Sequence, residues 1–310
     1  MADAAPVIDV QDLTKSFGSN VAVNRLSMQV QKGEIYGFIG LNGAGKTTTI
    51  RMLLGMISPS GGTCWLNGRK ITGGMSDIWE KVGYLVEIPY SYPELSVWEN
   101  LEIIRRLRYI SDKSLVDSII NKLKLSHYRK RKAKNLSLGN AQRLGLAKAL
   151  IHNPDILILD EPANGLDPAG IVEIREMLID LALNDGVTIF ISSHILGEVS
   201  KFATRLGIIH EGKLIQESEA AEIEQLRHRN LHVNTLNNKE AHTFLVKMRY
   251  DVKIIDEGLL EVTGSDAITR PEHVASLLVH EGLPPILLKI EEEDLESYFL
   301  RIIGIKGGAK

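Results

Sequence analysis

The stretch Gly40-Leu41-Asn42-Gly43-Ala44-Gly45-Lys46-Thr47 matches the pattern G-x-x-x-x-G-K-[ST]. It follows an apolar run from Ile35 to Ile39, and it precedes a segment with helical spacing from Thr47 to about Met56. Glycines let the backbone N–H groups point inward at phosphate oxygens, and the N-terminus of the following helix adds a partial positive charge. The sequence therefore predicts a phosphate-binding loop between a strand and a helix.

Loops of this class bind nucleoside triphosphates, and the roles of the residues here are those that the class as a whole shows. Lys46 supplies a mobile cation for the β- and γ-phosphates, and the Thr47 hydroxyl can ligate Mg²⁺. ATP and Mg²⁺ are therefore the expected cofactors. The loop residues expected to contact the nucleotide are Asn42, Gly43, Ala44, Gly45, Lys46, Thr47 and Thr48.

A second motif follows about 110 residues later, where the apolar run Ile156 to Leu159 ends in Asp160 and Glu161. A continuous apolar run is typical of a parallel strand covered on both faces. Asp160 is expected to hold Mg²⁺ through water, and Glu161 is expected to point at an attacking water as a general base. An acidic turn after a strand also has a plain structural interpretation, but its pairing with the phosphate loop favours the chemical one.

Strands alternate with helices in the first part of the chain, which indicates an α/β fold with a mainly parallel sheet over residues 1–218. The strand Leu26 to Val30 shows period-two alternation, and Val187 to Ile191 is another apolar strand. The pattern changes after about residue 218. We predict a helix at 220–229, then β-α-β-β-α-β at 231–236, 239–248, 252–255, 259–263, 271–279 and 286–290, and a last helix at 295–303. Residues 219–310 are thus expected to form a small α+β accessory domain, and the order of its elements suggests a ferredoxin-like topology.

Composition restricts the partners and the location. Lys+Arg number 36 and Asp+Glu 39, giving a net charge of −3, which argues against bulk nucleic-acid binding. The single cysteine, Cys64, allows no intrachain disulfide and fits a reducing cytoplasm. No apolar run reaches the roughly 18–20 residues that cross a bilayer, and the N-terminus does not resemble a secretory signal. Any action at a membrane is therefore expected to need a membrane-bound partner.

Four further segments resemble motifs of one family. Leu136-Ser137-Leu138-Gly139-Asn140-Ala141-Gln142-Arg143 resembles a degenerate form of the ABC signature LSGGQ, and Asn164-Gly165-Leu166-Asp167 resembles its D-loop. His194 resembles the switch histidine, and Phe17 resembles the aromatic residue that stacks on adenine. With the phosphate loop and the acidic pair, they occur in family order over residues 7–217. The chain is therefore similar to the ABC ATPases, which are P-loop NTPases with a helical signature subdomain.

The resemblance implies an ATP-sandwich homodimer that powers an integral membrane transporter subunit. In the family, signature residues meet the γ-phosphate that the other subunit holds; here these are Ser137, Gly139 and Asn140. His194 is expected to hold the γ-phosphate and to orient water and Glu161. Each residue also has a structural alternative, because Ser137 could be an ordinary helix N-cap and His194 or Phe17 a core residue.

Two departures from the family pattern point to a particular group within the ABC ATPases. Leu138 and Asn140 replace the usual Gly and Gln of the signature, and Glu87 stands where most ABC ATPases have the Q-loop glutamine. Glu87 there is expected to act as a metal ligand and to add negative charge beside the metal, unless it is a plain surface charge. Glu87 and the "SLG" signature together resemble the ATPase subunits of bacitracin-type and lantibiotic-immunity exporters. The resemblance implies a cytoplasmic subunit that is peripheral at the inner face of the cell membrane. It would power the export of antimicrobial peptides.

Other functions remain possible at this point. An exporter of drugs or lipids has the same motifs. A soluble ABC ATPase acting on ribosomes or DNA is disfavoured by the single cassette and the lack of sustained heptads. A module that senses ATP without turnover is disfavoured by Glu161 and His194. The basic run 129–134 is either a solvated loop or a contact for anionic lipid.

Overall fold

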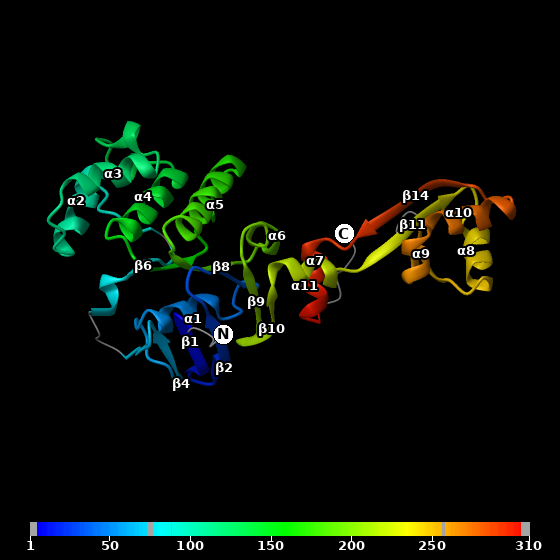
Figure 1. The fold of residues 1–310 in the computed structure, drawn as a ribbon, viewed down its shortest axis with the longest axis horizontal. Coiled ribbons are helices and arrows are strands. Elements are labelled where there is room, and N and C mark those ends of the chain that lie inside the picture. The colour runs from blue at the N-terminus through cyan, green and yellow to red at the C-terminus, as the bar shows by residue number, and fades with distance from the viewer. Residues whose placement is uncertain (1–4, 73–76, 88, 256–257, 305–310) are drawn as a thin grey trace. The chain divides into compact units, whose positions relative to one another are not determined.

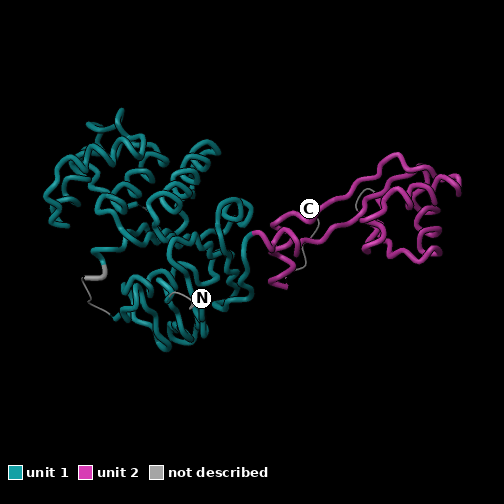
Figure 2. Tube along the Cα trace, in the orientation of Figure 1, with its two compact units in different colours: residues 1–220 teal, residues 221–310 magenta. Residues whose placement is uncertain are grey.

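The chain folds into two units, Met1–Ala220 and Ala221–Lys310, which Figure 2 shows in separate colours. The computed structural model describes residues 5–72, 77–87, 89–255 and 258–304. Each unit encloses a hydrophobic core of its own. Each is therefore described by itself.

A six-stranded sheet of order β10-β9-β3-β8-β7-β6 positions the predicted site in the first unit (Figure 1). Strands β9, β3, β8, β7 and β6 pair in parallel, and β10 is antiparallel to β9. The bounds are β3 Ile35–Ile39, β6 Val82–Leu85, β7 Ile156–Asp160, β8 Thr188–Ser193, β9 Arg205–His210 and β10 Lys213–Glu219. Every residue of β3 and β7 is buried, as parallel strands covered on both faces require. The carboxyl ends of parallel strands share one edge of the sheet, so the segments that follow β3, β7 and β8 meet there.

A second, antiparallel sheet has the order β2-β1-β4-β5. Its strands are β1 Ile8–Phe17, β2 Asn20–Val30, β4 Gly61–Leu66 and β5 Arg69–Lys70. Leu26, Met28 and Val30 are buried while Ser27 and Gln29 are exposed, which confirms the predicted alternation. The core cluster of this unit contains residues of both sheets. It also contains residues of α1, the helix that connects β3 of the first sheet to β4 of the second.

Helix α1 (Lys46–Leu53) begins inside the phosphate loop and is shorter than predicted. The sequence indicated a helix to about Met56, but α1 ends three residues earlier. Gly55 has a φ of +62°, and its N–H donates to the Met52 carbonyl. A left-handed residue closes the last turn of a helix in this way, because only glycine adopts that conformation without a steric penalty.

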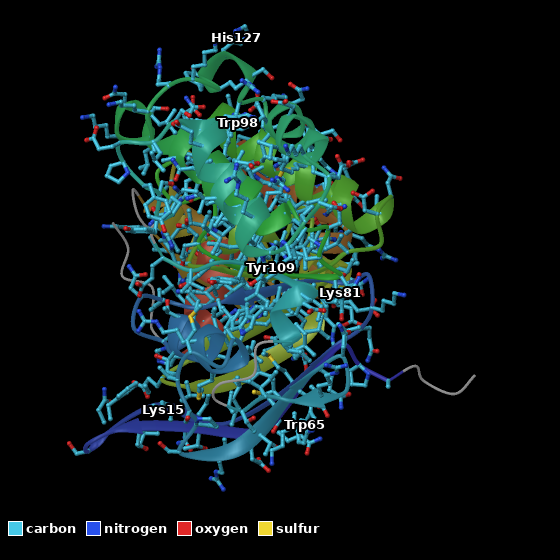
Figure 3. All side chains as sticks on the ribbon, turned by 90° about the vertical axis from the view of Figure 1, so that its left-hand side faces the viewer. Lys15, Trp65, Lys81, Trp98, Tyr109 and His127 are labelled. Atoms are coloured by element: carbon cyan, nitrogen blue, oxygen red, sulfur yellow. The ribbon has the colours of Figure 1, made fainter. Side chains whose placement is uncertain are left out.

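Helices α2, α3 and α4 form a group at the far end of the first unit from the antiparallel sheet (Figure 1). Figure 3 marks this end with Trp98 and His127 and the opposite end with Lys15 and Trp65. The helix bounds are α2 Val97–Leu107, α3 Ser114–Lys122, α4 Leu138–Leu150, α5 Pro168–Leu183 and α6 Leu196–Val199, with 3-10 turns at Asp77–Glu80, Ser126–Tyr128 and Ala133–Asn135. A capping box starts α2, because Ser96 accepts from the Glu99 N–H and the Glu99 carboxylate accepts from the Ser96 N–H.

The second unit contains an antiparallel sheet of order β12-β13-β11-β14. Its elements are α7 Ala220–Leu226 (whose first residue belongs to the first unit), β11 Arg229–Thr235, α8 Asn238–Lys247, β12 Asp251–Ile254, β13 Leu260–Thr263, α9 Ser265–Thr269, α10 Pro271–His280, β14 Pro285–Glu292 and α11 Leu295–Ile302. Its core joins the inward residues of β11, such as Leu231 and Val233, to residues of α8 and α10.

Each helix and strand predicted for this unit is present, with bounds that differ from the prediction by at most three residues. Two expectations were incomplete. The helix predicted at 220–229 stops at Leu226, because the chain enters β11 at Arg229. The short helix α9 was not foreseen, since Ser265–Thr269 is too brief to show a helical period. The connection between the strands predicted at 252–255 and 259–263 lies partly outside the described residues.

Candidate functional site

The phosphate loop between β3 and α1 depends on its glycines. Gly43 and Gly45 have φ angles of +82° and +107°, which side chains other than hydrogen rarely tolerate. A Cβ at Gly45 would lie 2.5 Å from the Ala22 carbonyl oxygen, and one at Gly40 would lie 2.6 Å from the Ile209 carbonyl oxygen. Lys46 is buried, and its ammonium donates to the Gly40 carbonyl at 2.7 Å, which folds the lysine over its own loop.

Asp160, at the end of β7, lies beside the first turn of α1. The Thr47 hydroxyl donates to Asp160 Oδ2 at 2.7 Å, and the Ser192 hydroxyl donates to Asp160 Oδ1 at 2.5 Å. Asp160 is 2% exposed, so the two hydroxyls compensate for the loss of water around its carboxylate. The predicted neighbours Thr47 and Asp160 are therefore in contact, and Ser192 is an additional member of the site.

Glu161 connects the phosphate loop to the segment after β8. Its Oε1 lies 3.2 Å from the Lys46 ammonium, at an angle that makes no hydrogen bond, and its Oε2 lies 2.8 Å from His194 Nδ1. The carboxylate is an acceptor, so His194 Nδ1–H donates to it and Nε2 remains available for another partner. Lys46, Glu161 and His194 thus form a continuous chain of contacts across three strand ends.

The backbone of Glu161 is held in a costly conformation. Its φ is +50°, in the left-handed region that residues with a Cβ avoid. Its N–H lies 3.2 Å from both the Ser192 hydroxyl and the Ser192 carbonyl, which stabilises this turn. Conformations of this kind cost on the order of 1–3 kcal/mol and cluster at functional sites. Here the turn directs the carboxylate toward Lys46 and His194.

The segment that resembles the signature begins α4. Ser137 is the N-cap, and its hydroxyl accepts from the backbone N–H of Asn140 at 3.4 Å and from the Asn140 side-chain amide at 3.0 Å. The structural role considered for Ser137 is therefore real. The cap uses the Asn140 N–H, while the N–H groups before it, which have no partner within the helix, are directed outward from the helix end. Gly139 occupies this first turn, so the three residues predicted to contact phosphate lie together at one helix end.

The starts of α4 and α5 pack against each other through two leucines and two glycines. A Cβ at Gly165 would lie 2.2 Å from Leu138 Cδ2, and a Cβ at Gly139 would lie 3.2 Å from Leu166 Cδ2. Each leucine therefore covers a glycine of the opposite segment. The segment that resembles the D-loop is thereby fixed to the segment that resembles the signature, a contact that the sequence analysis did not foresee.

Phe17 and Glu87 lie at the periphery of the site. Phe17 is 53% exposed with the Lys15 ammonium 5.0 Å from its ring centre, so it is not a core residue. The Glu87 carboxylate accepts from Arg51 Nη2 at 2.5 Å. The described contact of Glu87 is thus with Arg51 and not with Thr47 or Asp160, the other residues predicted to lie near the metal.

Three of the five basic residues in the run 129–134 pair with two acidic neighbours. Arg129 pairs with Asp117, and Lys132 and Lys134 both pair with Glu94. These pairs favour the solvated-loop interpretation over a lipid-binding patch.

The ABC transporter family matches residues 23–164, which extend from β2 past the acidic pair. The bacitracin transport ATP-binding protein BcrA of Bacillus licheniformis is 38% identical over 301 residues, covering 96% of this chain and 97% of BcrA. This chain belongs to the ABC transporter ATP-binding proteins. The lantibiotic transport ATP-binding protein SrtF of Streptococcus pyogenes is 41% identical over 213 residues, covering 69% of this chain and 91% of SrtF.

Solved structures agree with this assignment. The ATP-binding subunit of an ABC transporter, 26% identical, superposes with a TM-score of 0.64 over 71% of this chain and 92% of that one. A dimeric cassette bound to ADP and Pi has the same TM-score over 69% of this chain and 98% of its own, and at 22% identity it shows the fold alone. The predicted fold class, a P-loop NTPase of the ABC type, is confirmed.

This ABC protein is an ATPase, the ATP-binding subunit of a transporter.

Ser192 was not predicted from the sequence as a site residue. Its hydroxyl donates to the Asp160 carboxylate and accepts from the Glu161 backbone N–H. A signal was available, because Ser192-Ser193-His194 places hydroxyls at the end of a parallel strand beside the switch histidine. Within the described residues, none of the helices is both long and apolar enough to cross a bilayer.

Replacing Gly165 with Ala is expected to destabilise the first unit by about 2–4 kcal/mol. The new methyl group would collide with Leu138, and the φ of +75° would penalise any Cβ. Denaturant unfolding measures the loss. Adding Leu138→Ala should restore the part due to the collision but not the part due to φ.

Gly197→Ala is the matched control, since a Cβ there meets nothing within 4 Å and Gly197 lies in a helix without a positive φ. It should be neutral or slightly stabilising. Equal unfolding free energies for wild type and Gly165→Ala would contradict the packing of the two segments.

Proposed function

We propose that this ABC ATPase powers the export of antimicrobial peptides and so protects the cell that makes or meets them. The observation that carries the proposal is the similarity to BcrA, which continues through the second unit and covers 96% of the chain. The similarity to SrtF, a lantibiotic transport protein, supports the same substrate class. Glu87 and Leu138, two departures from most ABC ATPases, agree with it.

Hydrolysis is proposed to start from an exchange of partners at Lys46. Lys46 donates to the Gly40 carbonyl and lies 3.2 Å from Glu161. Phosphate oxygens offer the ammonium a stronger anionic partner, so Lys46 turns to them and leaves the Glu161 carboxylate unpaired on that side. Glu161 can then accept a proton from the attacking water, while His194 holds its other oxygen and orients it.

The oxygen atoms of Thr47 and Asp160 fit a Mg²⁺ ion, which prefers oxygen ligands and retains several waters. No cluster of three or more His, Cys, Asp or Glu side chains suited to a metal occurs in the described parts of the chain, so phosphates and water must complete the ligand set. We propose that Thr47 would ligate the ion, that Asp160 would hold it through water, and that Glu87 would be a further ligand from the Q-loop position. When bound, the ion neutralises charge on the β- and γ-phosphates.

The active unit is proposed to be a homodimer at the cytoplasmic face of the membrane, bound to an integral membrane subunit. Ser137, Gly139 and Asn140 of one copy would seal the ATP that Lys46 of the other copy holds. The outward N–H groups at the start of α4 support this role, because they suit an anion. The exposure of Phe17 supports stacking on adenine. No nucleic-acid partner is proposed.

The second unit is proposed to be a ferredoxin-like accessory domain over residues 219–310. Its antiparallel order β12-β13-β11-β14 and its β-α-β-β-α-β succession, with α9 added, support that topology. This unit lies outside the matched family region and inside the similarity to BcrA.

The proposal is tested by expressing the ABC ATPase with its membrane subunit in a susceptible bacterium. We expect resistance to bacitracin-type or lantibiotic peptides, and we expect it to disappear with Asp160→Asn, which disrupts the proposed metal site. Asp180→Asn, an exposed residue of α5, is the matched control. Unchanged peptide susceptibility, together with resistance to a small drug or altered lipid export, would overturn the substrate class.

A further inference from the structure

We propose that Arg51 is the positioning residue of the Q-loop carboxylate: it holds Glu87 at α1 and limits its approach to the phosphate site. This inference rests on the proposed placement of Glu87 near the metal. Arg51 Nη2 donates to Glu87 Oε1 at 2.5 Å. A glutamine at position 87 would have no charge to be held in this way, so the pair belongs to the departure from the family pattern.

The pair joins two parts of the site that lie 36 residues apart in the sequence. Arg51 lies in α1, five residues after Lys46, which is about 7.5 Å along the helix axis. Glu87 lies just after β6, in the segment that leads to α2. The ion pair therefore ties the helix that carries the phosphate-binding lysine to the segment that leads into the helical group.

The far side of this segment is fixed to the helical group. Asn100 of α2 is fully buried; its amide donates to the Tyr92 carbonyl, and its oxygen accepts from the Tyr92 N–H. Lys148 of α4 donates to the Tyr90 carbonyl and the Ser91 hydroxyl, and burial lowers the pKa of its ammonium to about 8. Residues 90–92 are therefore anchored to the helical group, while Glu87, a few residues earlier, contacts Arg51 of α1.

The strength of the pair suits a contact that forms and breaks. The side chains of Arg51 and Glu87 are 41% and 55% exposed, and only one nitrogen and one oxygen meet. Exposed pairs of this kind contribute little, and they are weakened further by salt. Glu87 also has a φ of +58°, so its backbone conformation is a costly one that the contacts around it must maintain. A nearby cation can therefore draw the carboxylate away from Arg51 at small cost.

Without Arg51, the Glu87 carboxylate would no longer be held at α1, and wherever it came closer to the triphosphate the like charges would repel and weaken ATP binding. We therefore expect Glu87→Gln to change the affinity for ATP in EDTA by less than about twofold when Arg51 is present. In the Arg51→Gln background the same substitution should tighten binding by about fivefold, the upper range for an exposed charge pair. Calorimetry on the purified full-length protein, without Mg²⁺, measures all four variants.

Two results distinguish positioning from simple charge. If Arg51 acts only as a positive charge, Glu87→Gln has equal effects in both backgrounds, and the proposal is overturned. The matched pair is Arg129 and Asp117, with 2.8 Å between the atoms and exposures of 40% and 54%. Arg129→Gln, Asp117→Asn and the double variant should leave ATP affinity unchanged, and a coupling as large as that of the Q-loop pair would also overturn the proposal.

The same experiment separates this inference from the proposed function. If the wild-type protein does not bind ATP, the proposed function itself fails. If it binds ATP and the two backgrounds respond equally, only the role of Arg51 fails.

Discussion

Replacing Glu161 with Gln is expected to slow ATP hydrolysis by about 10²–10⁴-fold, the usual contribution of a general base. Glutamine has nearly the same shape and can still meet His194, but it cannot take a proton from water. The Lys46 ammonium loses an anionic neighbour at 3.2 Å, so binding of the triphosphate should be retained or strengthened. Phosphate release from the purified protein measures the rate, and calorimetry measures the binding.

The variant should also preserve the ATP-bound dimer, because the nucleotide that seals it is not consumed. Size-exclusion chromatography in ATP would show the larger species for Glu161→Gln and a monomer after ATP is removed. Glu176→Gln, an exposed glutamate of α5, is the matched control and should hydrolyse ATP at the wild-type rate. Equal rates for wild type and Glu161→Gln would remove Glu161 as the base.

Replacing Ser137 with Asp is expected to reduce ATP hydrolysis on the order of a hundredfold or more without unfolding the protein. Aspartate caps a helix as well as serine does, so the start of α4 should persist. In the proposed dimer its carboxylate faces the γ-phosphate held by the other copy, and two such charges about 4 Å apart repel by about 4 kcal/mol at an intermediate dielectric. Ser137→Thr keeps both the cap and the neutral hydroxyl, and it should retain most activity.

Mixing variants tests whether Ser137 and Lys46 of different copies share one site. Homodimers of Ser137→Asp and of Lys46→Ala should each be inactive, because both sites of each are damaged. A mixed dimer places both changes in one site and leaves the other intact. An equal mixture should therefore recover roughly a quarter of wild-type activity, as a two-fold symmetric assembly requires. An inactive mixture would contradict the shared site.

Much of the site follows from the sequence, because its residues are held by local geometry. Gly43 and Gly45 allow the positive φ angles of the phosphate loop, and an apolar strand places Asp160 at a sheet edge. The Ser137 cap follows from the helical run that comes after it. In each case the residue type and its immediate neighbours suffice.

The remaining features depend on which strand lies beside which. Ser192 meets Asp160 because β8 pairs with β7, and Arg51 meets Glu87 because α1 reaches the segment after β6. Leu138 covers Gly165 across 27 residues of chain.

The sequence by itself determined the phosphate loop, the acidic strand end and the α/β class, since backbone sterics and hydrophobic periodicity act over a few residues. Tertiary structure decided the partners of Asp160, Glu87 and Gly165. A contact between side chains far apart in the chain depends on sheet order and packing, which no local pattern specifies.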